Sequence, residues 1–177
     1  MTDQPASNAN CTEVAGYSHV REFVANVPYL LMLMLGAAII FLTTTEGLLR
    51  WLAALGYVLY GLAGSLWIIA FVCPFCHFYD TRQCPCGYGQ FAPKFAARQD
   101  GGRFAEKFRR HIPVIVPLWL IPPAAGAWTL ISHFSIPPLL ILIAFLVNSY
   151  AILPLLSKRH CCASCPQKTD CPWMRGS

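Results

Sequence analysis

Long stretches of the chain contain no charged residue. Residues 23–45 form one such stretch of 23 residues, and residues 51–79 form another of 29. A charged side chain near the centre of a bilayer costs a few kcal/mol, so uncharged apolar stretches of about 20 residues predict membrane-spanning helices. We therefore predict one span within residues 27–43 and a second within residues 51–72.

A third uncharged stretch is too long for one span. It covers residues 111–157, 47 residues if His is counted as neutral. As a single helix it would be about 70 Å long, whereas the hydrocarbon core is about 30 Å thick. The polar and proline-rich sequence SHFSIPP at 132–138 predicts a break. The sequence therefore predicts four transmembrane helices arranged as two helical hairpins.

The basic residues predict the orientation of these helices. If the N-terminus is cytoplasmic, 12 of the 13 Lys and Arg residues lie on the cytoplasmic side, and only Arg50 lies on the other. Lys and Arg beside short loops prefer the cytoplasm. The first 26 residues also lack the basic start and apolar core of a cleaved signal peptide. We predict an all-α, multi-pass protein of the inner (cytoplasmic) membrane, with both termini and the central loop in the cytoplasm.

This topology divides the chain into five segments. They are a polar N-terminal segment (1–26), a first transmembrane hairpin (27–72), a Cys-rich basic loop (73–111), a second transmembrane hairpin (112–157) and a Cys-rich tail (158–177).

Composition agrees with a membrane protein and excludes several classes of function. Hydrophobic residues make up 56% of the chain and charged residues only 12%, about half the usual fraction of a soluble domain. The net charge of +5 is modest, and nearly all basic residues lie on the predicted cytoplasmic side. We therefore expect no nucleic-acid partner. The predicted spans contain no acidic residue, which argues against an ion pump or an active transporter. Membrane lipid is the first expected partner.

Proline and asparagine residues predict how the spans pack. The third span contains Pro113, Pro117, Pro122 and Pro123. A proline inside a helix leaves a carbonyl without its amide donor, and neighbouring helices must compensate. Asn148 lies inside the fourth span and is expected to form an interhelical hydrogen bond.

Eight of the nine cysteines form two groups of four, each directly after a predicted hairpin. The loop group is Cys73, Cys76, Cys84 and Cys86, and the tail group is Cys161, Cys162, Cys165 and Cys171. Cys11 stands alone and is interpreted as a surface thiol.

Both groups are predicted to face a reducing compartment, which favours metal binding over disulfides. Cys73 and Cys76, like Cys162 and Cys165, are separated by two residues, a spacing that lets both thiolates of a pair bind one centre. We favour two iron–sulfur clusters, with all eight cysteines as ligands. Zinc is the alternative. One version of it is a mixed site, in which Cys73 and Cys76 of the loop and Cys162 and Cys165 of the tail bind the same zinc ion.

The sequence Cys73-Pro74-Phe75-Cys76-His77 also matches the attachment motif of c-type haem. Attachment of this haem outside the cytoplasm would require the opposite topology, and it would leave the other clustered cysteines unexplained. We therefore disfavour it.

Residues 90–110 predict a basic surface beside the cysteines. Phe91 and Phe95, and then Phe104 and Phe108, are four residues apart, which is typical of two short amphipathic helices lying at the membrane interface. Their basic residues are candidates for binding anionic lipid or an acidic soluble partner: Lys94, Arg98, Arg103, Lys107, Arg109 and Arg110.

These features predict a non-catalytic subunit of a membrane complex, since no catalytic constellation is recognisable. We expect it to carry electrons between a soluble cytoplasmic oxidoreductase and a membrane carrier such as quinone. One alternative is a membrane anchor or scaffold for other subunits, stabilised by structural zinc. Another is a thiol-redox or metal-trafficking membrane protein.

Overall fold

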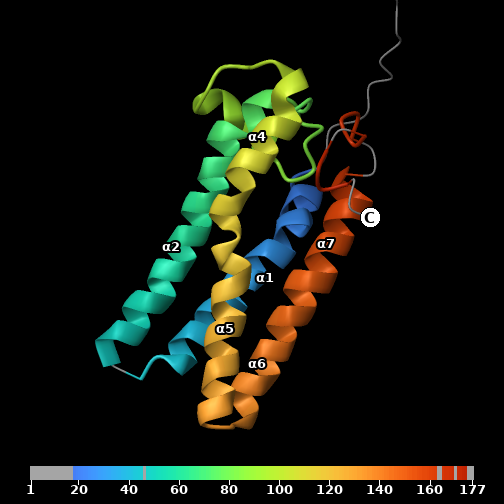
Figure 1. Ribbon diagram of the computed structural model, residues 1–177. Coiled ribbons are helices and arrows are strands. Elements are labelled where there is room, and N and C mark those ends of the chain that lie inside the picture. The colour runs from blue at the N-terminus through green and yellow to red at the C-terminus, as the bar shows by residue number, and fades with distance from the viewer. Residues whose placement is uncertain (1–17, 46, 163–164, 170, 175–177) are drawn as a thin grey trace, which may run out of the picture.

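The computed structural model describes residues 18–45, 47–162, 165–169 and 171–174. Within these ranges the chain is helical and contains no strand. Four helical segments are long and apolar enough to cross a membrane, and they pack as two antiparallel hairpins (Figure 1). The predicted all-helical fold, with four helices long and apolar enough to span a membrane, is confirmed.

The first hairpin consists of α1, His19–Thr43, and α2, Gly47–Phe71. Helix α1 begins well before residue 27, the predicted start of the apolar span. The cause is an N-cap: the Ser18 hydroxyl accepts a hydrogen bond from the Arg21 amide at 3.4 Å. The first two turns of α1 therefore extend beyond the apolar stretch towards the Cys-rich loop.

The second hairpin contains the third and fourth spans. The third span includes the 3₁₀ turn η3 (Gly101–Arg103), α4 (Phe104–His111), the 3₁₀ turn η4 (Ile112–Ile115) and α5 (Pro117–Ser132). The fourth runs through α6 (Ile136–Val147), the π-helix η5 (Asn148–Ile152), α7 (Leu153–Leu156) and the π-helix η6 (Ser157–Cys162). The predicted break at 132–138 is confirmed. Pro154 follows η5, and its missing amide explains the irregular hydrogen bonding there.

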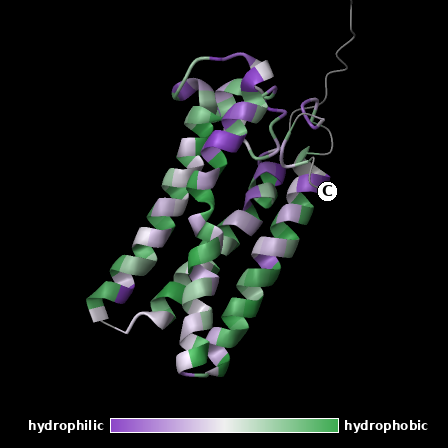
Figure 2. Ribbon diagram, viewed as in Figure 1, coloured by the Kyte–Doolittle hydropathy of each residue, from purple (hydrophilic) through white to green (hydrophobic). Residues whose placement is uncertain are grey.

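The loop between the hairpins folds into short pieces at one end of the bundle. It contains the 3₁₀ turn η1 (Cys73–Phe75), α3 (Tyr88–Phe91) and the 3₁₀ turn η2 (Ala92–Lys94). The start of α1 and the end of the fourth span lie at the same end (Figure 1). Hydrophilic residues gather there, whereas the remaining length of the bundle is largely hydrophobic (Figure 2).

Small residues let the helices approach closely. A Cβ atom at Gly36 of α1 would collide with the Tyr57 ring of α2, and one at Gly61 of α2 would collide with Leu33 of α1. Met32, Ile39, Leu118 and Phe145 fill the core between the four spans. These glycines therefore allow α1 and α2 to pack closely against each other.

The outer surface of the bundle is also apolar. The exposed fraction is 73% for Trp128 and 82% for Ile131, both on α5, and 73% for Leu48 on α2. Exposed apolar surface on this scale is unfavourable in water but suits a hydrocarbon environment. The apolar outer surface therefore indicates a membrane location.

Two backbone carbonyl groups of α5 lack their usual amide donor because that position is a proline, and each accepts a hydrogen bond from a tyrosine hydroxyl instead. In a regular helix the Leu118 carbonyl would accept from residue 122, which is a proline, and the Trp119 carbonyl would accept from residue 123, another proline. Instead the Tyr57 hydroxyl donates to the Leu118 carbonyl at 2.7 Å, and the Tyr150 hydroxyl donates to the Trp119 carbonyl at 3.0 Å.

Asn148 forms the expected interhelical bond. Its Nδ2 donates to the Pro28 carbonyl of α1 at 2.9 Å. Polar side chains thus connect α1, α2, α5 and the fourth span.

The predicted amphipathic helices form only in part. Helix α4 forms, with the rings of Phe104 and Phe108 5.8 Å apart, but it continues through η4 into α5 instead of standing as a separate element (Figure 1). Before it, residues 96–100 are not helical. The structure does not confirm that either predicted helix lies flat on the membrane. The turn η3 is followed directly by α4, which is continuous with the rest of the third span.

Candidate functional site: cysteine turns around a cavity

The first cysteine pair is held in a tight turn at the end of α2. The Cys76 amide donates to the Cys73 carbonyl at 3.0 Å, closing the turn η1. Pro74 lies at the start of this turn, where its fixed φ angle favours the conformation. Burial raises the pKa of the Cys76 thiol to about 11, although the Phe78 amide donates to the sulfur and opposes the shift.

The second pair lies in the sequence CPCGYG. The Gly87 amide donates to the Cys84 carbonyl at 3.0 Å, and Gly87 has a φ of 76°, which glycine adopts without strain. A Cβ atom on Gly89 would collide with the Phe78 carbonyl oxygen and lie 3.0 Å from the Cys84 Cβ. Both glycines are therefore required for this turn to form and to pack against the first one.

Backbone amides surround the Cys84 sulfur. The amides of Gly89, Cys86, Tyr88 and Gly87 all donate to it. Burial nevertheless raises the pKa of Cys84 above its ordinary value, because removal from water outweighs these bonds. Four converging amide donors make the site favourable for a thiolate once a cation compensates its charge.

The tail repeats the geometry of the first pair. The Cys165 amide donates to the Cys162 carbonyl at 3.2 Å, and the Cys171 amide donates to the Gln167 carbonyl at 3.0 Å. Burial raises the pKa of Cys165, and the Gln167 amide opposes the shift by donating to its sulfur. Cys171 is 8% exposed.

Three cysteines share one local feature: the amide two residues further along the chain donates to the sulfur. This holds for Cys76, Cys84 and Cys165. Such bonds favour the thiolate form and, in metal–thiolate sites, tune the centre. The cysteine spacing alone did not reveal them.

Gln167 fastens the tail to the loop. Its Oε1 accepts from the His77 amide at 2.8 Å, and its Nε2 donates to the carbonyls of Phe75 and Gly101 at 3.3 Å each. Its own backbone also binds Cys165 and Cys171. One side chain therefore connects the first loop turn to the tail turn, and no motif in the sequence pointed to it.

The thiols of the two groups lie close enough for their charges to interact. Besides burial, the charges of Cys84, Cys165 and Cys171 raise the pKa of Cys76, and those of Cys171 and Cys84 raise the pKa of Cys165. Loop and tail cysteines thus gather in one region, as a mixed site would require. The Cys161 side chain and Cys11 lie outside the described residues.

The described side chains do not form a closed metal site. In the described ranges, no three His, Cys, Asp or Glu side chains are grouped closely enough to hold one metal ion. Cys73, Cys76, Cys84, Cys165 and Cys171 are all thiols. Metal binding therefore requires these side chains to rotate towards a common centre.

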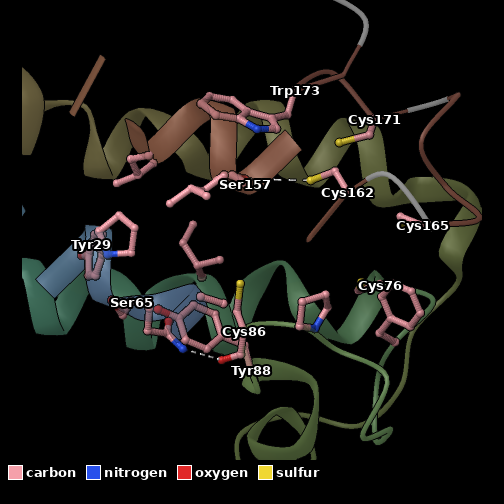
Figure 3. Close-up of a pocket in the computed structure, with 18 of the residues that line it drawn as sticks. Tyr29, Ser65, Cys76, Cys86, Tyr88, Ser157, Cys162, Cys165, Cys171 and Trp173 are labelled. Carbon is pink, nitrogen blue, oxygen red and sulfur yellow. Dashed lines mark hydrogen bonds between the residues drawn. The ribbon is translucent and has the colours of Figure 1, made fainter. Parts of the chain in front are cut away.

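A cavity of about 960 Å³ provides space for such rotation. Cysteines from loop and tail face it from opposite sides (Figure 3). They are Cys76, Cys86, Cys162, Cys165 and Cys171. Residues of α1, α2, η4, α5 and α7 also line the cavity, so it extends from the thiols to the membrane-spanning helices.

The charged residues among the described lining are all basic: Arg21, Arg159 and Lys168. This positive charge complements thiolates, which are negative when they bind a metal. Burial raises the pKa of Tyr88, another lining residue, to about 12, so its hydroxyl stays protonated at neutral pH.

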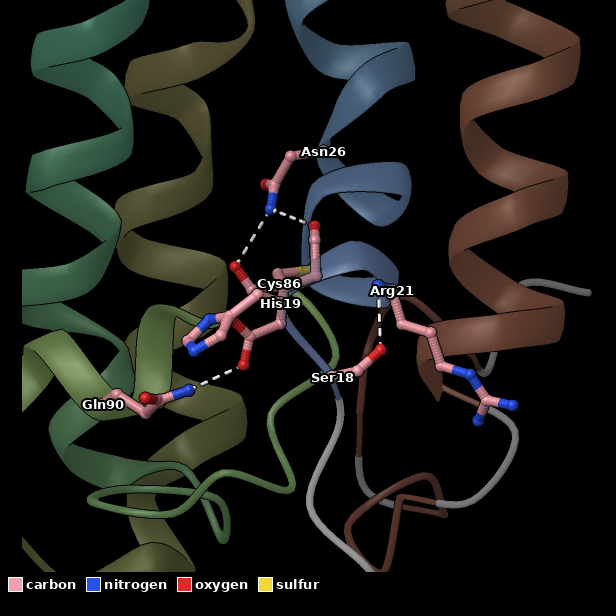
Figure 4. A network of polar contacts seen from close by, with 7 residues as sticks. Ser18, His19, Arg21, Asn26, Cys86 and Gln90 are labelled. Atoms are coloured by element: carbon pink, nitrogen blue, oxygen red, sulfur yellow. Dashed lines mark hydrogen bonds and ion pairs between the residues drawn. The ribbon is translucent and has the colours of Figure 1, made fainter.

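Polar contacts from α1 hold the second cysteine turn (Figure 4). Asn26 Nδ2 donates to the Cys86 carbonyl at 3.0 Å, and Gln90 Nε2 donates to Glu22 Oε1 at 2.7 Å. His19 Nδ1 lies 3.4 Å from Glu22 Oε2. The early start of α1 is what places these side chains beside the loop.

The predicted basic residues lie mostly on the surface. Lys94, Arg98, Arg103, Arg109 and Arg110 are exposed, and Lys107 is half-buried with its Nζ 5.4 Å from the centre of the Phe75 ring. Arg103 pairs with Glu106 at 3.3 Å. The basic surface therefore lies next to the first cysteine turn.

Comparison with protein-family models, with curated proteins and with solved structures finds no significant match to this chain.

Proposed function

We propose that this chain is a membrane electron-transfer subunit that carries iron–sulfur clusters at the Cys-rich end of its four-helix bundle. One observation supports this most: cysteine turns from the loop and the tail surround a single cavity that extends between the spanning helices. A redox centre there would lie between water and the membrane interior, where a carrier of electrons needs it.

The cysteine residues suit this role. Cys73, Cys76, Cys84 and Cys86 would supply thiolates from the loop, and Cys161, Cys162, Cys165 and Cys171 from the tail. The amides that donate to sulfur would stabilise the thiolates and set the reduction potential. The clusters supply one-electron transfer, whereas the protein supplies ligands, amide donors and compensating basic charge.

The basic surface suggests the soluble partner. Its exposed Arg and Lys side chains would attract an acidic oxidoreductase to the end of the bundle where the cysteines lie. The same surface would bind anionic lipid, and the positive-inside distribution supports a cytoplasmic orientation in the inner membrane.

Metal analysis tests the proposal. The full chain is purified anaerobically in detergent, and iron, acid-labile sulfide and zinc are quantified alongside optical and electron paramagnetic resonance spectra. We expect iron and sulfide in similar amounts, visible absorption and a spin signal on reduction. Cys165→Ser should reduce the iron content, whereas Cys11→Ser should leave it unchanged. Colourless protein that contains zinc alone would refute the proposal.

A second candidate is a zinc-stapled membrane scaffold. The three Gln167 hydrogen bonds and the proximity of loop and tail thiols favour it, because a structural zinc would reinforce the same connection. Zinc at one or two ions per chain, without colour, would support this candidate. Thiol-redox chemistry has less support, because a raised pKa keeps the Cys76 thiol protonated and unreactive at neutral pH.

A further inference from the structure

Helix α2 uses only part of its circumference to contact the rest of the bundle. On the side towards α1, Gly61 packs against Leu33. Near the cysteines α2 also contacts the third span, where Trp67 Nε1 donates to His111 Nδ1 at 3.2 Å. The helix lies at the edge of the bundle (Figure 1). Its opposite side therefore forms part of the outer surface.

Six leucines line that outer side at a regular spacing. They follow one another at alternating intervals of four and three residues, and their exposed fractions range from 46% to 73%. This leucine stripe consists of Leu48, Leu52, Leu55, Leu59, Leu62 and Leu66. Leucine therefore occupies every a and d position of a heptad repeat between residues 48 and 66. At 1.5 Å per residue the stripe is about 27 Å long, nearly the thickness of the hydrocarbon core.

The residues that flank the stripe allow a second helix to approach closely. A Cβ atom on Gly56 would meet no other atom within 4 Å, and Ala63, seven residues later, is also exposed. Small side chains of this kind let membrane helices pack against each other. Arg50, the one charged residue of α2, lies off the stripe, with its guanidinium 5.3 Å from the centre of the Phe41 ring of α1. No charged side chain of α2 therefore interrupts the stripe.

Contact with lipid does not account for the choice of leucine. Fluid lipid tails accept any apolar side chain, and the outward positions of α6 at the same spacing are mixed: Ile136, Leu140, Ile143 and Val147. A heptad repeat of one residue type is instead typical of helices that pair with a left-handed crossing, which is the usual packing of spanning helices. A stripe of identical side chains is also complementary to itself, as a two-fold contact between copies requires.

We propose that α2 pairs with the α2 helix of a second copy of this chain through the leucine stripe. Both copies cross the membrane in the same direction, so the paired helices are parallel and are related by a two-fold axis along the membrane normal. Cys73 follows the end of α2 by two residues, so the pairing places both Cys-rich ends on one side of the membrane, next to each other. None of the six leucines lines the cavity, so the pairing does not depend on metal binding.

Photo-crosslinking in cell membranes tests the pairing directly. The photoreactive residue p-benzoylphenylalanine replaces Leu59, and the products are identified by mass spectrometry. We expect a covalent product with twice the mass of the chain, linked to α2 of the second copy. The same replacement of Leu140 in α6 is the control and should give no such product, because Leu140 is similarly exposed (60%) but lies outside the stripe. Products linked only to lipid or to another protein, or equal amounts of dimer from both positions, would overturn the proposal.

Truncation of the stripe gives a quantitative test. Energy transfer between donor- and acceptor-labelled full chains is followed while the protein is diluted with lipid in proteoliposomes. Leu55→Ala combined with Leu62→Ala should raise the dissociation constant about tenfold or more, because packing holds spanning helices together. The matched control is Leu140→Ala combined with Ile143→Ala, which shortens two outward side chains of α6 and should leave the dissociation constant unchanged.

Equal weakening by both pairs of substitutions, or energy transfer at the random level in the original protein, would refute the pairing. Circular dichroism shows whether each variant keeps its helical content. If the truncated chain fails to fold, the cross-link from position 59 decides, because it is measured without shortening any leucine of the stripe to alanine.

Discussion

At the scale of single residues, Tyr57 replaces the hydrogen-bond donor that Pro122 lacks. Its hydroxyl binds the Leu118 carbonyl at 2.7 Å in a buried position. Tyr57→Phe should destabilise the protein by about 1 kcal/mol, because the carbonyl loses this replacement donor while the ring remains in place. The midpoint of thermal unfolding in detergent measures this loss.

A double-mutant cycle makes this prediction specific. In a Pro122→Ala background, the new amide can bind the Leu118 carbonyl, so Tyr57→Phe should cost distinctly less than in the original protein. Equal costs in both backgrounds would show that the tyrosine acts through packing and not through this bond.

Gln167 makes a separate prediction at this scale. Gln167→Ala removes two hydrogen bonds between the tail and residues 75 and 77 at the first loop turn, and a third to the Gly101 carbonyl of η3. The tail should separate more readily, with faster proteolysis after residue 160 and reduced metal content. Gln99→Ala is the control, because the Gln99 side chain is exposed and its Nε2 donates to the nearby Ala97 carbonyl, within its own segment. Equal proteolysis of both variants would contradict the role assigned to Gln167.

At the scale of elements, the spans were predictable and the turns were predictable only in part. The uncharged stretches and the break at SHFSIPP identified four helices, because the hydrocarbon core excludes charged side chains along the whole length of a span. The early start of α1 depends on Ser18 and on contacts with residues 86 and 90, so local hydropathy could not show it. The continuation of α4 into α5 was missed because its charged residues indicated a surface helix.

The turn that contains Cys84 gives a prediction for an element. Gly89→Ala should disrupt it, because the added Cβ would collide with the Phe78 carbonyl oxygen, which belongs to rigid backbone. We expect metal content to fall at least severalfold while the helical content stays the same by circular dichroism. Gly56→Ala is the control, since no atom lies within 4 Å of an added Cβ on Gly56. Unchanged metal content in Gly89→Ala would contradict this account of the turn.

At the scale of the whole molecule, the sequence identified the cysteines but could not show how loop and tail meet. Two groups, each following a hairpin, suggested two separate centres. In the structure, the charges of Cys165 and Cys171 help to raise the pKa of Cys76, although they come from a segment about 90 residues further along the chain. This proximity depends on the packing of two hairpins and on Gln167, neither of which leaves a periodic signal in the sequence.

The gathered thiols also make the stability of the metal-free protein depend on pH. Burial raises the pKa of Cys76 from 9.0 to about 11, so the folded state binds this proton more tightly than the unfolded state. The resulting stabilisation is complete below about pH 9 and is lost as the pH rises towards 11. The thermal midpoint of chelator-treated protein should therefore fall over this interval. Cys76→Ser should flatten the decline, whereas Cys11→Ser should preserve it, and a decline that persists fully in Cys76→Ser would assign it to other groups.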